Sequence, residues 1–366
     1  MQKTSTANKY ATLDAIRGIS AILVVLRHAP KSFGGLDFQQ SYLAVDLFFV
    51  MSGFVIANAY ESKLTQGRLS FAGFMRLRFI RLYPLYILGT SIGIGAVLLR
   101  EHYVDCAPVA SLRTLAIIFA LGLFMLPSVV TSGLYPLDRP AWSLFFELIA
   151  NAGYAIFHRH LTSKRLVIVA AATGSLIVVK ALYSRQVDVG DHWLYVYMGL
   201  ARVTFSFSVG ILLYRFRSAG RRVSDLRAVA ALGLSAAVLC VPSTPAGSGA
   251  LAAVSIVALI PAIIHFAASF EPSTRLHRLF TWSGTISYGV YVLHVPILMA
   301  CQYVLAHTLG LDLSRFPWIM VLLPGVILFV HLADRFYDAP VRAWVLARGR
   351  AKVPSNLHGF ERTADS

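Results

Sequence analysis

The sequence predicts an all-α integral membrane protein, from its composition, its long apolar runs and the distribution of its basic residues. Of the 366 residues, 57% are hydrophobic and 14% are charged, whereas a soluble globular chain carries about 25% charged residues. The formal net charge of +16 is of the kind that the cytoplasmic loops of a membrane protein contribute. This composition excludes an ordinary soluble enzyme. No nucleic-acid partner is expected, because the arginines alternate with full-length apolar runs.

Eleven apolar runs come close to the length of about 20 residues that a helix needs to cross a bilayer core of about 30 Å. They cover residues 16–35, 42–60, 82–99, 114–130, 141–157, 166–182, 193–214, 228–241, 250–270, 281–306 and 318–337. Short polar or Pro/Gly-rich connections separate them, and no linker marks a second domain. The cysteines Cys106, Cys240 and Cys301 lie far apart without CxxC spacing, so neither a disulfide framework nor a metal site is expected.

Basic residues in short loops indicate the cytoplasmic side. They gather in the loops 61–81, 158–165 and 215–227 and in the tail from residue 338. Three apolar runs lie between the first two of these loops, so one of the three does not cross. The run 114–130 is the best candidate because Pro127 interrupts it; the runs 82–99 and 141–157 stay open as alternatives. We therefore predict about ten transmembrane helices, one re-entrant or interfacial segment and cytoplasmic termini, with a membrane domain over 1–342 and a basic, disordered tail over 343–366.

Arg17 and His28 lie within or at the edge of the first apolar run. A charged group at the centre of a bilayer costs about 2.5 to 3.5 kcal/mol, so each needs a reason to be there. Eleven residues turn a helix through about 1100°, which places both side chains on one face, about 16 Å apart along the axis. This arrangement predicts a functional pair. The alternative is that Arg17 anchors the helix at the interface and that His28 is a packing residue.

Asp46 lies about four residues into the second run, and we expect it to meet His28 at a similar depth. A carboxylate hydrogen-bonded to one ring nitrogen would set the tautomer of the histidine and raise the basicity of the other nitrogen. The alternative is that Asp46 caps the first turn of its own helix.

Arg78 and Arg81 enter the third run from the cytoplasmic side, at i and i+3. They can share a helix face and present planar donors to a polyphosphate, and Arg17 is expected on the same side of the bilayer. Three arginines at one cytoplasmic opening suit a ligand with a diphosphate. Positive-inside topology alone is the alternative explanation.

Two further groups of polar residues lie in apolar runs. Ser143 and Glu147 are at i and i+4 and share a face. A glutamate in a membrane must be protonated, paired with arginine or hydrated. The alternative for Glu147 is an interfacial position in a first helical turn. Ser287, Tyr291 and His294 form a polar stripe near the carboxyl end. Packing and interhelical hydrogen bonds would explain that stripe.

Several of these segments together resemble the acyltransferase-3 family, the integral-membrane acyltransferases that modify O-antigens, exopolysaccharides, Nod factors and some antibiotics. The resemblance runs from about residue 10 to 342 and is carried by LDAIRGISAILVVLRHA, AVDLFFVMSGFVI, RLRFIRLYPLY, PAWSLFFE, ISYGVYVLHVP and YDAP. It implies ten spans in the inner membrane of a bacterium, acyl-CoA as the donor and a hydroxyl group as the acceptor. It implies no tightly bound cofactor, since acetyl-CoA is a co-substrate.

Residue by residue, the resemblance makes His28 the catalytic histidine and Arg17 its motif partner. It makes Arg78 and Arg81 the pair that holds the CoA phosphates, and Glu147 the acidic residue after Trp-Ser. Asp338 in YDAP departs from the glutamate that is more usual in the family.

The sequence thus predicts a membrane O-acyltransferase that moves an acyl group, most often acetyl, from cytoplasmic acyl-CoA to a hydroxyl of a cell-surface glycan or glycolipid. The catalytic residues would be His28 as general base, Asp46 and Glu147; an acyl-histidine intermediate stays open. The alternative from another class is a transporter or flippase of a lipid-linked saccharide, whose inverted repeats the sequence does not show convincingly. A purely structural scaffold is a third possibility, one that would not need the Arg17–His28 geometry.

Overall fold

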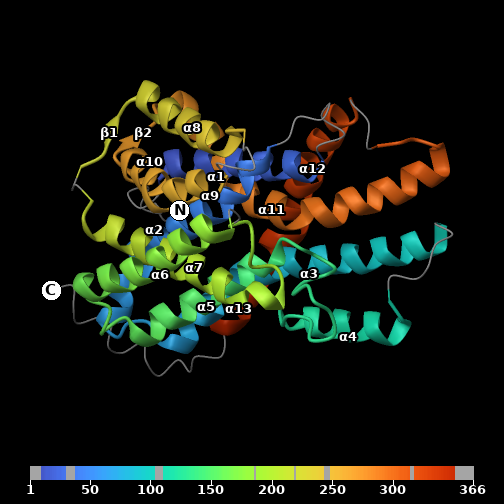
Figure 1. Cartoon of the computed structure of the whole chain (residues 1–366), viewed down its shortest axis with the longest axis horizontal. Helices are drawn as coiled ribbons and strands as arrows, with labels where there is room; N and C mark the ends of the chain where they lie inside the picture. The colour runs from blue at the N-terminus through green and yellow to red at the C-terminus, as the bar shows by residue number, and fades with distance from the viewer. Residues whose placement is uncertain are drawn as a thin grey trace.

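The structure, a computed structural model, describes residues 10–29, 38–103, 110–184, 187–217, 220–242, 248–313 and 317–350. Helices dominate this part of the chain (Figure 1). They are α1 (Ala11–His28), η3 (Gln39–Leu43), α2 (Ala44–Thr65), α3 (Phe71–Tyr103), α4 (Leu112–Leu123), α5 (Ala141–Phe157), α6 (Ser163–Ser184), η4 (Trp193–Tyr195), α7 (Val196–Arg215), α8 (Asp225–Cys240), α9 (Ser248–Val254), η5 (Ser255–Leu259), α10 (Ile260–Ala268), α11 (Thr274–Leu309), α12 (Ile319–Ala333), η6 (Asp334–Asp338) and α13 (Ala339–Arg350). Two short strands, β1 (Arg222–Val223) and β2 (Phe270–Glu271), pair in parallel.

Every predicted apolar run overlaps a helical segment. Within the described residues, seven segments are long and apolar enough to cross a membrane: Gln39–Thr65, Phe71–His102, Ser163–Ser184, Trp193–Arg215, Gly249–Ala268, Thr274–Leu309 and Ile319–Arg348. The 12-residue helix α4 is only about 18 Å long, less than the bilayer core. These helices agree with an all-α membrane protein. The total of ten spans, the re-entrant segment and the side of each terminus stay predictions.

The predicted boundary at residue 343 falls inside a helix. The last helix, α13, continues to Arg350, and residues 351–366 of the predicted tail lie outside the described residues, as does Cys106. The π-helical turn η6 joins α12 to α13 without a break. The basic segment after residue 338 therefore begins as a continuation of the last apolar helix.

The first helix, α1, lies in the middle of the bundle and packs closely along α11 (Figure 1). Glycine on each helix makes this approach possible: a Cβ atom on Gly284 would be 2.3 Å from the Cβ of Asp14, and one on Gly18 would be 2.6 Å from the Cβ of Ser283. Further along both helices His28 faces His294. The two helices therefore run in the same direction, although about 260 residues separate them in the sequence.

The strand β2 holds the beginning of α1 in place. The Glu271 carboxylate accepts a hydrogen bond from the backbone N–H of Ala11 at 2.9 Å and one from Arg221 at 2.6 Å. The Thr12 hydroxyl donates to the carbonyl of Phe270 at 2.6 Å. These bonds satisfy groups that a helix leaves unpaired at its start, and they set the position of the first turns of α1.

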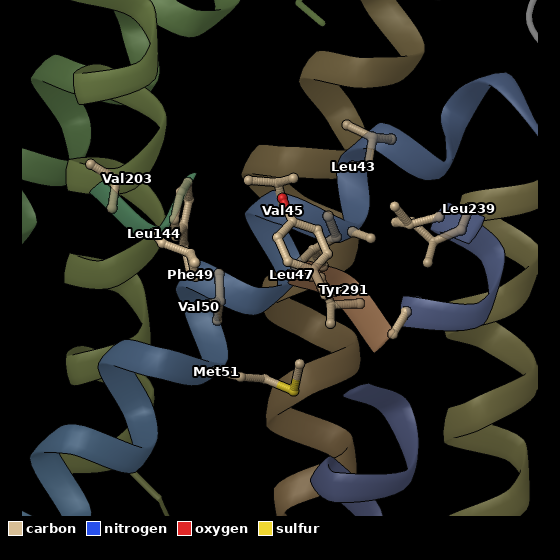
Figure 2. Packing of buried hydrophobic residues seen from close by; sticks show 14 of the residues in the cluster. Leu43, Val45, Leu47, Phe49, Val50, Met51, Leu144, Val203, Leu239 and Tyr291 are labelled. Atoms are coloured by element: carbon tan, nitrogen blue, oxygen red, sulfur yellow. The ribbon is translucent and has the colours of Figure 1, made fainter. Parts of the chain in front are cut away.

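The helix α2 lies between α7 and the α1–α11 pair, with apolar side chains on both sides. In Figure 2, Phe49 of α2 faces Leu144 and Val203, whereas Val45 and Leu47 lie close to Tyr291. The backbones of α2 and α7 approach closely where small residues meet, as is usual between membrane helices. A Cβ atom on Gly210 would be 2.0 Å from the carbonyl oxygen of Val50.

We expect Gly210→Ala to lower the free energy of unfolding by about 1 to 3 kcal/mol, because the added methyl group meets rigid backbone rather than a movable side chain. Thermal unfolding in detergent would measure the effect. The matched control is Gly233→Ala in α8, where a Cβ atom meets nothing within 4 Å, so that variant should keep or slightly raise its stability. Equal melting temperatures for the two variants would contradict the close α2–α7 contact.

Candidate active site

A cavity of about 390 Å³ lies among α1, α2, α3, α5, α11 and the η6–α13 segment. Its polar lining consists of Asp14, Arg17, Ser52, Tyr60, Arg78, Arg81, Ser143, Glu147, Thr285, Ser287, Tyr288, Tyr291, Asp334, Asp338 and Arg342. The predicted trio Arg17, Arg78 and Arg81 therefore lies around one cavity. Helical spacing places Arg78 and Arg81 on one face of α3, and the cavity between α1 and α3 brings Arg17 into the same lining.

The four arginines of the cavity differ in their partners. Arg78 pairs with Glu147 at 2.8 Å, and Arg342 pairs with Asp338 at 2.7 Å. Among the described residues, no hydrogen bond or ion pair engages Arg17 or Arg81, and the side chain of Arg81 is exposed within the cavity wall. Two guanidinium groups are thus available to an anion that enters the cavity.

Glu147 lies on the cavity wall and is held by two partners. One carboxylate oxygen accepts a hydrogen bond from Arg78 at 2.8 Å and one from the Ser52 hydroxyl at 2.7 Å. Of the alternatives for a glutamate in a membrane, the structure therefore shows pairing with arginine. The Nε atom of Arg78 is buried without a partner among the described residues, so this arginine keeps a donor that the protein does not use.

The predicted contact between Asp46 and His28 is wrong. Both oxygens of the Asp46 carboxylate accept hydrogen bonds from Arg202 of α7, at 3.0 Å from Nε and 2.6 Å from Nη2. Neither side chain of this pair is exposed. The third donor of Arg202 bonds the carbonyl of Val189 at 3.0 Å. A bidentate guanidinium satisfies a buried carboxylate better than a histidine at the same depth would.

Arg202 is a residue that the sequence analysis missed, although a signal for it was present. It lies in the middle of the apolar run 193–214, and an ionisable residue inside a span marks a functional or paired position. The same criterion singled out Arg17 and His28. Tyr42 and Trp142 also lie against the guanidinium, with ring centroids 5.7 and 5.6 Å away.

His28 ends α1 and contacts a second histidine. Its Nδ1 atom lies 3.2 Å from Nε2 of His294 and 2.8 Å from the carbonyl oxygen of Val24, one turn earlier. The two rings meet edge to face with centroids 4.9 Å apart. His28 is exposed, whereas His294 is fully buried.

The histidine pair lies next to the cavity but does not line it. Tyr291, one turn before His294, lines the cavity, and its ring lies 6.3 Å from that of His294. The Tyr291 hydroxyl shares a hydrogen bond of 2.8 Å with Ser143. The predicted polar stripe on α11 thus connects the cavity wall to the histidine pair, and Ser287 is bound to the carbonyl of Gly284 in its own helix.

The arrangement therefore has an anion-binding end and a histidine end. Arg17 lies near the beginning of α1 and His28 at its end, about 16 Å further along the axis. In the described part of the chain, no group of three or more His, Cys, Asp or Glu side chains is placed to hold a metal ion. The chemistry that this geometry supports is the binding of an anionic ligand at one end and proton transfer at the other.

A family model described as an acyltransferase domain matches residues 10–334. The chain belongs to the acyltransferase-3 family. The match includes His28, Asp46, Arg17, Arg78, Arg81 and Glu147. Together with the long apolar helices, membership shows a multi-pass membrane protein with an acyltransferase domain.

Two curated proteins are similar to this acyltransferase-3 chain. "Protein 2 in picA locus" of Rhizobium radiobacter is 40% identical over 193 residues, which are 48% of this chain and 97% of that protein. The peptidoglycan O-acetyltransferase OatA of Listeria monocytogenes is 24% identical over 93% of this chain, which spans 57% of the length of that protein. No solved structure matches the chain.

Proposed function

We propose that this acyltransferase-3 protein is an O-acyltransferase of the bacterial inner membrane that moves an acyl group, most simply acetyl, from cytoplasmic acyl-CoA to a hydroxyl of an extracytoplasmic or lipid-linked glycan. The observation that carries the proposal is the cavity with two unpaired arginines at one end and the Tyr291–His294–His28 contacts at the other. The name of the Listeria relative, a peptidoglycan O-acetyltransferase, supports a glycan hydroxyl as the acceptor.

The donor would bind through its phosphates at the arginine end. Within the described residues, no carboxylate forms an ion pair with Arg17 or Arg81, and Arg78, held by Glu147, contributes its unused Nε donor. Guanidinium groups suit phosphate because their planar donors match its oxygens. Binding energy from the nucleotide would then position the thioester further along the cavity.

Part of the cavity wall is apolar and includes Tyr291, whose ring lies 6.3 Å from that of His294. Val45, Phe48 and Leu144 line it together with Ser143 and Tyr291. These side chains would receive the acyl end of the donor, and its carbonyl would approach the side of the cavity nearest His294 and His28. Glu147 acts through Arg78 in this proposal, and Asp46 acts through Arg202, which holds α2 against α7.

In the transfer step, the acceptor hydroxyl oxygen attacks the thioester carbon while His28 takes the hydroxyl proton. The carbon–sulfur bond then breaks, and the CoA thiolate leaves and is protonated to the thiol. In the variant route the His28 nitrogen attacks the thioester carbon, the carbon–sulfur bond breaks and the CoA thiolate leaves. The acceptor hydroxyl oxygen then attacks the acyl carbon, the carbon–nitrogen bond breaks, and the hydroxyl proton passes to the thiolate. In both routes CoA stays at the arginine end.

The first test uses inverted membrane vesicles that contain the full chain, with labelled acetyl-CoA added on the exposed cytoplasmic face. We expect label in the extracted glycan fraction and none in vesicles without the protein. If a lipid-linked saccharide instead changes leaflet without gaining label, the transferase proposal fails and a flippase function replaces it.

For the donor site, we expect Arg81→Ala to raise the KM for acetyl-CoA about 10-fold to 100-fold with little change in kcat. A hydrogen bond to a charged group contributes about 1.5 to 3 kcal/mol, and the loss of uniform binding appears in KM. The matched control is Arg76→Ala on the same helix, which bonds the carbonyl of Val345 and does not line the cavity. With acetyl-pantetheine, which lacks the phosphates of CoA, Arg81→Ala and wild type should behave alike. An unchanged KM for acetyl-CoA in Arg81→Ala would place the phosphates elsewhere.

A further inference from the structure

The surroundings of His294 allow one arrangement of its ring protons. Its Nδ1 atom lies 3.0 Å from the carbonyl oxygen of Val290 and 2.8 Å from that of Tyr291. Carbonyl oxygens only accept hydrogen bonds, so Nδ1 carries a proton. A second proton on Nε2 would create a buried charge on a side chain with no exposed surface, which costs free energy without an opposite partner. The neutral ring therefore presents the Nε2 lone pair to His28.

The same argument then assigns the protons of His28. Its Nδ1 atom faces the carbonyl oxygen of Val24 at 2.8 Å and the Nε2 atom of His294 at 3.2 Å. Both partners are acceptors, so Nδ1 of His28 must be the donor. In the neutral ring the lone pair is consequently on Nε2, the nitrogen that neither of these contacts uses.

We propose that His294 is the positioning residue of His28, which keeps the Nδ1–H tautomer in place so that Nε2 acts as the base. The inference rests on the proposed function for its catalytic consequence, but the ring assignment stands on the contacts alone. When Nε2 takes the proton of the acceptor hydroxyl, Nδ1–H keeps two acceptors, and these stabilise the positive ring. The proton on Nε2 later passes to the leaving thiolate, so His294 itself neither gains nor loses a proton.

Asp46 and Asp188 are both engaged with arginines, which leaves this role to His294. Asp46 is bound to Arg202, and Asp188 is paired with Arg27 at 2.5 Å. Arg139, on the loop before α5, is paired with Asp191 at 2.9 Å. Among the described residues, no carboxylate contacts the His28 ring. A histidine thus occupies the place that a carboxylate takes in many general-base pairs.

Two amide substitutions separate positioning from packing. In His294→Gln the longer side chain can place its amide oxygen where Nε2 was, and so accept from His28. In His294→Asn the shorter amide can bond the carbonyls of its own helix but cannot reach His28. We expect His294→Asn to lower kcat at least tenfold with an unchanged KM for acetyl-CoA, and His294→Gln to recover most of the rate. The control is His331→Asn, a half-buried histidine on α12, which should match wild type.

The ring assignment is tested without activity by ¹⁵N NMR of histidine-labelled full-length protein in lipid nanodiscs. The His28 signals are identified by their loss in His28→Gln. We expect a protonated Nδ1 and an unprotonated Nε2 on His28 of the wild type and of His294→Gln, and a change of this pattern in His294→Asn. Free histidine prefers the opposite tautomer, so the expected pattern is specific to the site.

A failure of the His294 inference and a failure of the proposed function give different results in these experiments. A proton on Nε2 of neutral His28 in the wild type would overturn the inference, as would equal kcat values for His294→Asn and His294→Gln in folded protein. If the NMR pattern is as expected but wild-type vesicles transfer no acyl group, the proposed function fails and the ring assignment stands.

Discussion

His28→Ala is expected to lower kcat for acyl transfer by about 10² to 10⁴-fold, the usual contribution of a general base. Binding of acyl-CoA should be unchanged, because His28 does not line the cavity that holds the arginines. The measurement is transfer of labelled acetyl to glycan in vesicles, together with equilibrium binding of labelled acetyl-CoA to the purified protein. The two readouts separate loss of chemistry from loss of the site.

The control for this variant is His265→Ala. His265 is an exposed histidine in the last turn of α10, so the same change at a comparable position should leave both readouts near wild type. Substantial transfer by a folded His28→Ala protein would contradict a chemical role for this histidine. Loss of acetyl-CoA binding in that variant would instead show that His28 helps to form the donor site.

Arg202→Leu is expected to lower the free energy of unfolding by about 3 to 5 kcal/mol, because it leaves the Asp46 carboxylate buried without its partner. The same loss is expected for Asp46→Leu, which leaves the guanidinium unpaired. In the double variant Asp46→Leu/Arg202→Leu both charges are gone, so most of the stability should return. Thermal or denaturant unfolding in detergent measures all three proteins.

The comparison for this pair is Arg215→Leu on the same helix. Arg215 binds Glu61 at 2.6 Å, but the side chains are 19% and 23% exposed, so solvent weakens the pair and the cost of losing it should be smaller. If the double variant were as unstable as either single variant, the two losses would come from packing around α2 and α7. The ion pair itself would then contribute little.

The helices and the arginine cavity were predictable because helical periodicity determines which residues share a face. Arg78 and Arg81 are three residues apart and share a face of α3, and the expected orientation put Arg17 of α1 on the same side of the bilayer. All three line one cavity in the structure. The helix α4 ends at Leu123, before Pro127, the residue that interrupts the predicted run 114–130. The first residues of the predicted basic tail are helical, because α13 continues the apolar helix before it through η6.

The contacts between helices were not predictable in the same way. The positions of His28 and Asp46 within their apolar runs put both at a similar depth in the membrane, which made them reasonable partners. A similar depth does not determine how each helix is rotated about its axis relative to its neighbours. In the structure Asp46 faces α7 and Arg202, whereas His28 faces α11 and His294. The sequence showed Arg202 and His294 as polar residues in apolar runs. Small residues such as Gly210 and Gly284 lie where these helix pairs approach each other most closely.

The contact between α1 and α11 has a consequence for the order in which a ribosome completes this protein. The histidine that ends α1 is made early in synthesis, whereas its partner on α11 is made about 260 residues later. Until α11 inserts, the nascent chain has Arg17 and His28 without the wall formed by Ser287 and Tyr291. On the proposed function, a partly synthesised chain would therefore lack the site until its last helices are translated.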